Sequence, residues 1–165
     1  MATTAFKGTP VHTNGDLPAT GSSAPDFQLL GIDLAPKTLA DFAGKKKILT
    51  INPSYDTPVC QAAARTFNQR AADIDDVVVL VISADLPFAQ KRFCVAEGLD
   101  DVVPLSTFRS DFLKHYGLEL VDGPLEGLAA RAIVVLDADN RVVHTELVPD
   151  IAQEPDYDAA LAAVS

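Results

Sequence analysis

Two cysteines, Cys60 and Cys94, are the residues with the most distinctive chemistry in this sequence. A deprotonated cysteine is a strong nucleophile, and an oxidised cysteine condenses with a nearby thiol to form a disulfide. The alternative for both is a small apolar side chain packed in a core. Because structural disulfides are rare in reducing compartments, a bond between these two cysteines would indicate catalysis or redox sensing.

Cys60 lies at the predicted start of a helix. Thr57 followed by Pro58 is a helix-start signal, because Thr is a good N-cap and Pro is favoured at the first helical position. Cys60 is then the third helical residue, in the first turn. Free N–H groups and the positive end of the helix dipole stabilise a thiolate there. The position favours a nucleophile, although a cysteine that only packs an amphipathic helix would also fit it.

Apolar runs and helical spacing predict the elements that position these residues. Strands are expected at residues 24–30, 47–52, 77–83, 102–107, 132–137 and 141–147, and helices at 58–72, 86–97, 108–116 and 156–164. Residues 1–25 are expected to form a hairpin or an extended lead, with Asn14-Gly15 as the turn. Because strands and helices alternate, residues 1–165 are expected to form one α/β domain with a mixed central sheet and helices on both faces.

Composition excludes several classes of protein. The net charge is −10 with 13 Lys and Arg, whereas nucleic-acid binders usually carry a basic patch. The one dense basic run, residues 45–47, is expected to be a solvated start of a strand. The longest apolar run, residues 77–82, is far shorter than the roughly 20 residues of a membrane-spanning helix, and the N-terminus lacks a secretory signal. We therefore expect a cytoplasmic protein without a nucleic-acid or membrane partner.

No metal or cofactor is predicted. The histidines, His12, His115 and His144, are not spaced with a cysteine in a ligand motif, and haem or flavin binding has no support. A serine hydrolase would require a sharply turned serine such as Gly-x-Ser-x-Gly, which the sequence lacks.

Several motifs in order resemble those of peroxiredoxins. Pro53, Thr57 and Cys60 match the pattern Pro-x-x-x-Thr-x-x-Cys. The segments at residues 83–94, 105–109, 121–124, 130–132 and 147–149 are similar to those of a bacterial subfamily, the thiol peroxidases. The resemblance runs from about Phe6 to the C-terminus and implies a thioredoxin-like fold.

The resemblance implies a role for each matching residue. Cys60 would be the cysteine that attacks peroxide, and Thr57 would hydrogen-bond the reacting oxygen or the sulfur. Pro53 would shield the pocket, and Arg131 would be the active-site arginine. These roles agree with the chemistry, because displacement at oxygen needs a thiolate and positive potential for the departing alkoxide. Tyr55 departs from the family, in which an aliphatic residue is common: its phenol either lies beside the pocket, where it could alter substrate preference, or lies on the surface.

For Cys94 the resemblance implies the resolving role, in which its thiol forms an intramolecular disulfide with the oxidised Cys60. Thioredoxin would then reduce that disulfide. The resemblance also suggests a homodimer that acts on hydrogen peroxide and organic hydroperoxides. Without it, a buried helical cysteine is the simpler interpretation of Cys94.

Two other functions remain open on the residues alone. A thiol–disulfide oxidoreductase of similar fold would carry Cys-x-x-Cys, but Thr57 stands where its other cysteine would be. A redox relay that senses peroxide and passes oxidation to a partner would use the same cysteine chemistry as a peroxidase.

Overall fold

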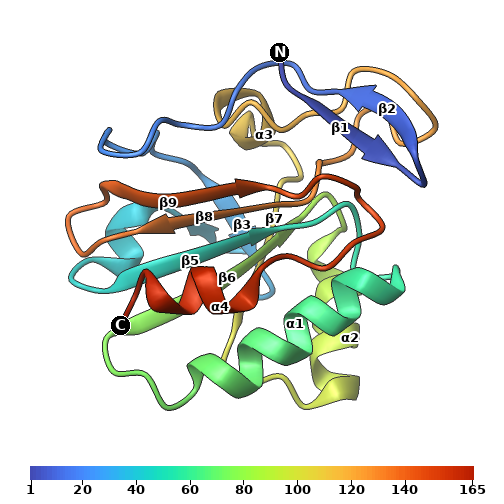
Figure 1. Cartoon of the computed structure of the whole chain (residues 1–165). Coiled ribbons are helices and arrows are strands. Elements are labelled where there is room, and N and C mark those ends of the chain that lie inside the picture. Colours follow the sequence, from blue (N-terminus) through green and yellow to red (C-terminus); the bar gives the residue numbers. More distant parts are fainter.

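A computed structural model describes residues 1–165 as a seven-stranded sheet with helices on both sides (Figure 1). The strand order is β4-β3-β7-β6-β5-β8-β9, in which β5, β6 and β7 run parallel and the other pairings are antiparallel. The strands are β3 (Leu29–Gly31), β4 (Pro36–Lys37), β5 (Lys46–Ile51), β6 (Val77–Ser83), β7 (Val103–Ser106), β8 (Ala132–Leu136) and β9 (Val142–Leu147). The predicted mixed sheet is confirmed.

The central strands are mostly apolar because both of their faces are covered. In β6, Leu80 and Ile82 point into one hydrophobic cluster, whereas Val79 and Val81 point into the other. The second cluster lies under the helices α1 (Pro58–Ala71), α2 (Pro87–Glu97) and α4 (Tyr157–Ala162) (Figure 1). The sheet therefore separates two cores, and both cysteine-bearing helices cover the same face.

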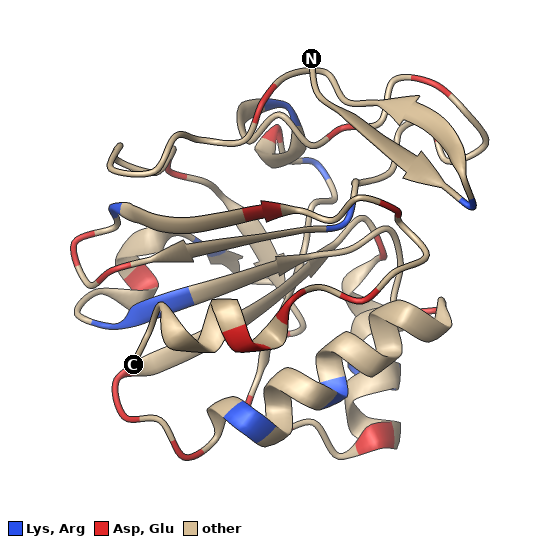
Figure 2. Cartoon of the chain, in the orientation of Figure 1, with Lys and Arg blue, Asp and Glu red and all other residues tan.

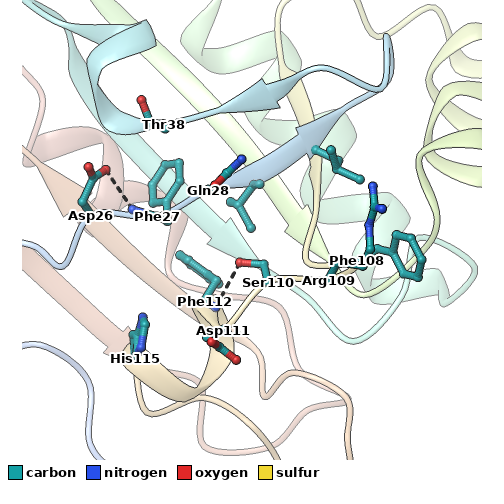
Figure 3. Close-up of a pocket in the computed structure, with 12 residues that line it drawn as sticks. Asp26, Phe27, Gln28, Thr38, Phe108, Arg109, Ser110, Asp111, Phe112 and His115 are labelled. Carbon is teal, nitrogen blue, oxygen red and sulfur yellow. Dashed lines mark hydrogen bonds between the residues drawn. The ribbon is translucent and has the colours of Figure 1, made fainter.

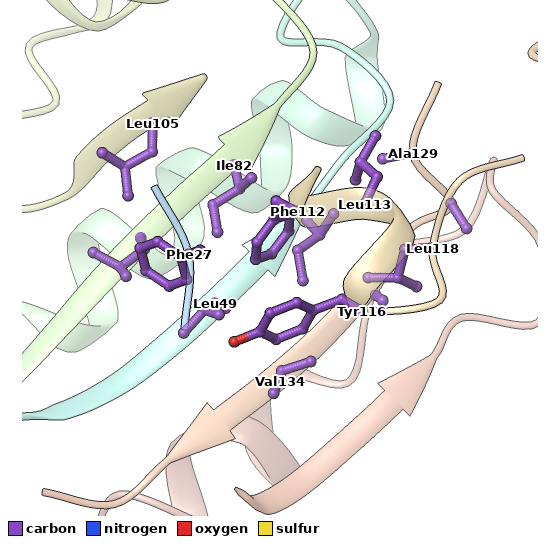
Figure 4. Close-up of a cluster of buried hydrophobic side chains, with 14 of the residues drawn as sticks. Phe27, Leu49, Ile82, Leu105, Phe112, Leu113, Tyr116, Leu118, Ala129 and Val134 are labelled. Carbon is purple, nitrogen blue, oxygen red and sulfur yellow. The ribbon is translucent and has the colours of Figure 1, made fainter. Parts of the chain in front are cut away.

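The opposite face is covered by the short helix α3 (Phe112–His115), the 3₁₀ helix η1 (Leu39–Phe42) and the N-terminal segment. Figure 4 shows Phe112 and Tyr116 packed over the apolar side chains of the central strands. The two rings stack with centroids 4.3 Å apart, and the Tyr116 hydroxyl donates to the carbonyl of Pro25 at 2.7 Å. This core fixes the N-terminal segment to the sheet.

The N-terminal hairpin exists, but its predicted turn is wrong. Strands β1 (Thr3–Phe6) and β2 (Thr9–His12) turn at Lys7-Gly8, where both residues have positive φ, 51° and 85°. A two-residue turn of this kind matches the twist of a hairpin, and Gly adopts positive φ without steric cost. The two N–H groups donate to the Asp150 carboxylate at 3.1 and 2.9 Å. A carboxylate distant in the sequence thus anchors the turn at Lys7-Gly8, whereas local composition predicts a turn at Asn14-Gly15.

Two predicted elements are shorter than expected. The helix predicted over 108–116 is reduced to α3, because Arg109 has a left-handed φ of 61° that a helix cannot contain. The strand predicted over 24–30 begins only at Leu29, where β3 pairs with β7 and β4. Residues 24–28 belong to no helix or strand.

Lys47 corrects the expectation of a solvated basic run. The residue is fully buried in β5, and its Nζ donates to the Lys45 carbonyl at 2.9 Å and to Asn140 Oδ1 at 2.6 Å. Burial lowers the pKa of Lys47, although Asp137 and Asp139 oppose that shift. Figure 2 shows the acidic residues spread over loops, helix ends and strand β9. None of the helices combines the length and the apolar character that a membrane span requires.

Candidate active site

Helix α1 begins as the sequence predicts. Thr57 is its N-cap, Pro58 is its first residue, and the backbone N–H of Cys60 donates to Thr57 Oγ1 at 3.3 Å. The Thr57 hydroxyl itself donates to the Ser54 carbonyl at 3.1 Å. One lone pair of Oγ1 therefore remains free to accept a further hydrogen bond. Cys60 is 2% exposed, at the start of the helix.

Arg131 lies at the sheet edge from which the loop to α1 departs. Ile51 pairs with Ala132 in the last pair of the antiparallel β5–β8 ladder. Asn52 and Arg131 therefore lie opposite each other just beyond the end of that ladder. The Arg131 guanidinium donates from Nη1 to Asn52 Oδ1 at 2.9 Å and from Nε to the Ile151 carbonyl at 2.8 Å. Arg131 is only 2% exposed and forms no ion pair. Its positive charge is therefore oriented without being neutralised.

Asn52 is a site residue that the sequence reasoning missed. The apolar run predicts Asn52 as the last residue of a strand, but β5 ends at Ile51 and the Asn52 amide accepts from Arg131. Its Nδ2 donates to the Thr50 carbonyl at 3.0 Å, which fixes the orientation of the amide. The available signal was a polar residue at the end of a buried strand, directly before Pro53.

The loop before α1 is buried more deeply than expected. Pro53 is buried, and Tyr55 is only 2% exposed, so the surface position considered for Tyr55 is wrong. The Tyr55 hydroxyl donates to the Val81 carbonyl at 2.7 Å, and its ring meets Phe93 edge-on with centroids 5.4 Å apart. The pKa of Tyr55 is raised well above its usual value by burial, with smaller contributions from the charges of Cys94, Asp85 and Cys60. The ring thus packs in the same cluster as Cys94 and Phe93, while its backbone lies in the loop that leads to Cys60.

Cys94 lies in the second half of α2, which begins at Pro87 and stops at Gly98 with a left-handed φ of 65°. It packs in the same hydrophobic cluster as Tyr55 and Phe93. Burial raises the pKa of the Cys94 thiol to about 11, so at neutral pH this residue is a protonated, weakly nucleophilic thiol. Both cysteines are free thiols in this structure.

The predicted site residues fall into two groups. Thr57 and Cys60 are joined by a hydrogen bond, and Arg131 is fixed at the sheet edge where their loop begins. Cys94 belongs instead to the hydrophobic cluster below the sheet and is linked to that loop by way of Tyr55. The fold therefore places Cys60 at the start of α1, places Arg131 beside Asn52 where the loop to α1 begins, and keeps Cys94 in an apolar core.

A cavity of about 620 Å³ lies outside this constellation (Figure 3). It opens between β3 and the segment that leads into α3, and the residues around it include Asp26, Thr38, Arg109 and His115. Neither cysteine lines it. This cavity is thus separate from both cysteines.

Comparisons with known proteins agree with the fold and identify its family. The redoxin family profile matches residues 19–161. The thiol peroxidases of Mycobacterium bovis and Mycobacterium tuberculosis are each 54% identical over 164 residues, which is 99% of both chains. A crystal structure of a peroxiredoxin-like protein from Aquifex aeolicus superposes with a TM-score of 0.94 at 36% identity, covering 99% of this chain and 96% of the other. A thiol peroxidase from Chromobacterium violaceum superposes with a TM-score of 0.86 at 25% identity, covering 97% and 93%.

A thioredoxin-like sheet with a cysteine in the first turn of the helix after β5 defines a redoxin-type protein. The chain belongs to the redoxin family and, within it, to the thiol peroxidases, which are enzymes of the peroxiredoxin type. The fold and the family that the sequence motifs implied are both confirmed.

Proposed function

We propose that this enzyme reduces peroxides with Cys60 as the attacking thiolate. The sulfur displaces at the nearer peroxide oxygen, the O–O bond breaks, and Cys60 becomes a sulfenic acid while the departing alkoxide or hydroxide takes up a proton. The observation that carries the proposal is the start of α1. There Cys60 donates its N–H to the N-cap Thr57, at the sheet edge where Arg131 lies buried without a carboxylate partner.

The residues around Cys60 have separate roles in this proposal. Arg131 supplies positive potential for the thiolate and for the alkoxide that develops, and Asn52 holds the guanidinium in place. Thr57 orients the peroxide through the free lone pair of its hydroxyl oxygen. The buried Pro53 shields the pocket from bulk water.

The proposed cycle continues through Cys94, the other cysteine of the chain. Its sulfur attacks the sulfur of the Cys60 sulfenic acid, which gives an intramolecular disulfide and one molecule of water. A dithiol reductant, proposed to be thioredoxin, then transfers two electrons to restore both thiols. The substrates proposed are hydrogen peroxide and organic hydroperoxides, and the compartment proposed is the cytoplasm.

A homodimer is proposed from the same family resemblance. An exposed apolar surface around the start of α2 supports it, formed by Leu86, Phe88, Phe108 and Leu34. Phe88 is 68% exposed, which is unusual for an aromatic side chain of a monomer when other apolar side chains adjoin it. Burial between two copies would remove this surface from water.

Steady-state turnover with a thioredoxin system tests the proposed cycle. Hydrogen peroxide and an alkyl hydroperoxide are compared at equal concentration, with Cys60→Ser as the inactive control. Many turnovers per enzyme support a peroxidase, whereas one oxidation per chain would indicate a stoichiometric redox relay. Reduction of insulin disulfides by the same preparation would instead indicate a thiol–disulfide oxidoreductase.

A further inference from the structure

We propose that Asp85 is a positioning residue that latches the loop before Cys60 onto the segment before α2, and so controls when the two cysteines meet. Ser54, Tyr55 and Asp85 are here called the Asp85 latch. The proposal rests on the proposed function, because it assigns the control of the step in which Cys94 resolves the oxidised Cys60.

The Asp85 carboxylate binds both segments at once. Its Oδ1 accepts from Ser54 Oγ at 2.8 Å, and its Oδ2 accepts from the Tyr55 N–H and from Ser83 Oγ, both at 2.6 Å. All three donors are neutral, and Asp85 forms no ion pair. Hydrogen bonds to an ionised acceptor are about twice as strong as neutral ones. The negative charge of the Asp85 carboxylate therefore strengthens the bonds from Ser54 and Tyr55 that hold the loop.

The side chain of Tyr55 provides the second attachment of the same loop. Its hydroxyl donates to the Val81 carbonyl of β6, and its ring packs edge-on against Phe93, the residue before Cys94. Gln90, in the first half of α2, joins the network, because its Nε2 donates to Ser83 Oγ at 3.1 Å. The segment before Cys60 and the helix of Cys94 are therefore held to each other through the latch.

This arrangement opposes disulfide formation. A disulfide needs Cα atoms roughly 4.4–6.8 Å apart and side chains directed at each other. Here Cys60 is fixed in the first turn of α1, whereas Cys94 is buried in a cluster that includes Tyr55 and Phe93. We infer that, for the sulfurs to meet, the Tyr55 ring leaves Phe93 and the loop moves, so that the backbone bond from Tyr55 to Asp85 lengthens or breaks.

Release of the latch also activates Cys94. In the closed form burial raises the pKa of this thiol to about 11 from an ordinary value of 9.0. Exposure to water would return the pKa to the ordinary value, which increases the thiolate fraction at neutral pH about a hundredfold. The same opening thus brings the sulfurs together and converts Cys94 into a nucleophile.

The latch therefore sets a competition between two fates of the sulfenic acid. While the latch is closed, a second peroxide can oxidise Cys60–SOH to the sulfinic acid, with release of water or alcohol. Once it opens, Cys94 forms the disulfide and releases water. A tighter latch favours the closed geometry needed for the first attack, but it also favours over-oxidation.

The variant Asp85→Asn tests the latch, because asparagine keeps the shape but replaces the charge and one acceptor oxygen. We expect a slower first attack, faster disulfide formation and a smaller sulfinic fraction at a fixed excess of peroxide, measured by quenched-flow and intact mass. General damage to the fold would slow both steps. Ser54→Ala, which removes one donor, is the milder variant should Asp85→Asn fold poorly, and smaller changes in the same directions are expected.

The matched control is Asp158→Asn. It removes the same charge and breaks the ion pair of Arg70 Nη2 with Asp158 Oδ1, 2.6 Å long, which joins α1 to α4 and does not involve α2. Neither step should change in this variant.

A second measurement does not depend on peroxidase activity. In a Cys60→Ser background, Cys94 is the only thiol, and its alkylation by iodoacetamide should accelerate when Asp85→Asn is added, by up to about a hundredfold if the latch opens fully. Unchanged labelling together with an unchanged sulfinic fraction would overturn the latch. Failure of wild-type protein to form a Cys60 sulfenic acid or a Cys60–Cys94 disulfide would instead overturn the proposed function.

Discussion

The guanidinium of Arg131 is held by the amide of Asn52, with 2.9 Å between Nη1 and Oδ1. An amide orients the cation without cancelling its charge, whereas a carboxylate at the same position would neutralise it. The distinction matters at a site that is proposed to stabilise a thiolate and a departing alkoxide, because both need positive potential. Arg131 is buried, so solvent screens its field only weakly.

The first prediction concerns this amide. Asn52→Asp keeps the size and the acceptor but adds a negative charge beside Arg131, so the second-order rate of Cys60 with peroxide should fall by about tenfold to a hundredfold, equal to about 1.4–2.8 kcal/mol. Stopped-flow measurement of the first oxidation checks this result. Asn140→Asp, which places a carboxylate beside the buried Lys47 at the far end of β5, is the control and should leave the rate unchanged. A wild-type rate in Asn52→Asp would show that the charge of Arg131 does not act on the reaction.

The second prediction concerns the hydroxyl of Thr57. Thr57→Val removes the cap of α1 and the bond from the Cys60 N–H, and the loss of a cap costs about 0.5–2 kcal/mol of stability. We expect the peroxide rate to fall well beyond what the lost stability explains, when it is measured far below the melting transition. Asp156→Ala removes the cap of α4, whose Oδ1 accepts from Ala159 N at 3.0 Å, and should reduce stability without slowing Cys60. If Thr57→Val and Asp156→Ala reacted with peroxide at the same rate, Thr57 would have no specific role in the mechanism.

A third prediction follows from the protonation of Cys94. Its pKa is about 11 in the folded protein against an ordinary 9.0, so the folded state binds the proton more tightly than the unfolded state. The stabilisation from this group is complete below pH 9 and is lost as the pH rises towards 11. Cys94→Ala should therefore lose less stability than the wild type between pH 9 and 11 in denaturant titrations. If the free energy of unfolding fell equally with pH in Cys94→Ala and in the wild type, Cys94 would not be a buried, protonated thiol.

The same protonation predicts selective labelling of the reduced enzyme. At pH 6 to 7 almost all of Cys94 is protonated, whereas Cys60 lies in the first turn of α1, at the positive end of the helix dipole. Cys60 should therefore react with iodoacetamide much faster than Cys94, as peptide mass spectrometry would show. Labelling in 6 M urea, where both thiols are exposed, should abolish the difference. Equal labelling in the native protein would refute the stabilisation of the Cys60 thiolate.

The sequence predicted those parts of the fold that depend on local signals. The limits of β6 and the start of α1 were correct, because an unbroken apolar run and a Thr-Pro pair depend only on neighbouring residues. The contact from Arg131 to Asn52 joins residues 79 apart, and the contact from Tyr55 to Asp85 joins residues 30 apart. These contacts follow from strand register and packing. The left-handed φ of Arg109 likewise had no local signal, so α3 was predicted too long.

The last prediction concerns the motion that resolution requires. One turn beyond Cys94, α2 is joined to α1 by Arg65 and Glu97, whose two hydrogen bonds of 2.9 Å form a bidentate ion pair. In the disulfide form the first turn of α1 and the residues of α2 around Cys94 must leave their present packing, at the cost of local rather than global unfolding. Backbone amides there should therefore exchange faster in the disulfide form than in the reduced form, whereas those of β8, which pairs with β5 and β9 and carries neither cysteine, should not change.

Glu97→Gln sharpens the same experiment. It weakens the clasp without touching either cysteine, so exchange in α2 should increase already in the reduced form, and high salt should produce a similar increase in the wild type by screening the pair. Because the pair is partly exposed, its effect should be smaller than that of Asp85→Asn. Exchange that is identical around both cysteines in the reduced and disulfide forms would show that the sulfurs meet without local unfolding, and the latch would then have nothing to control.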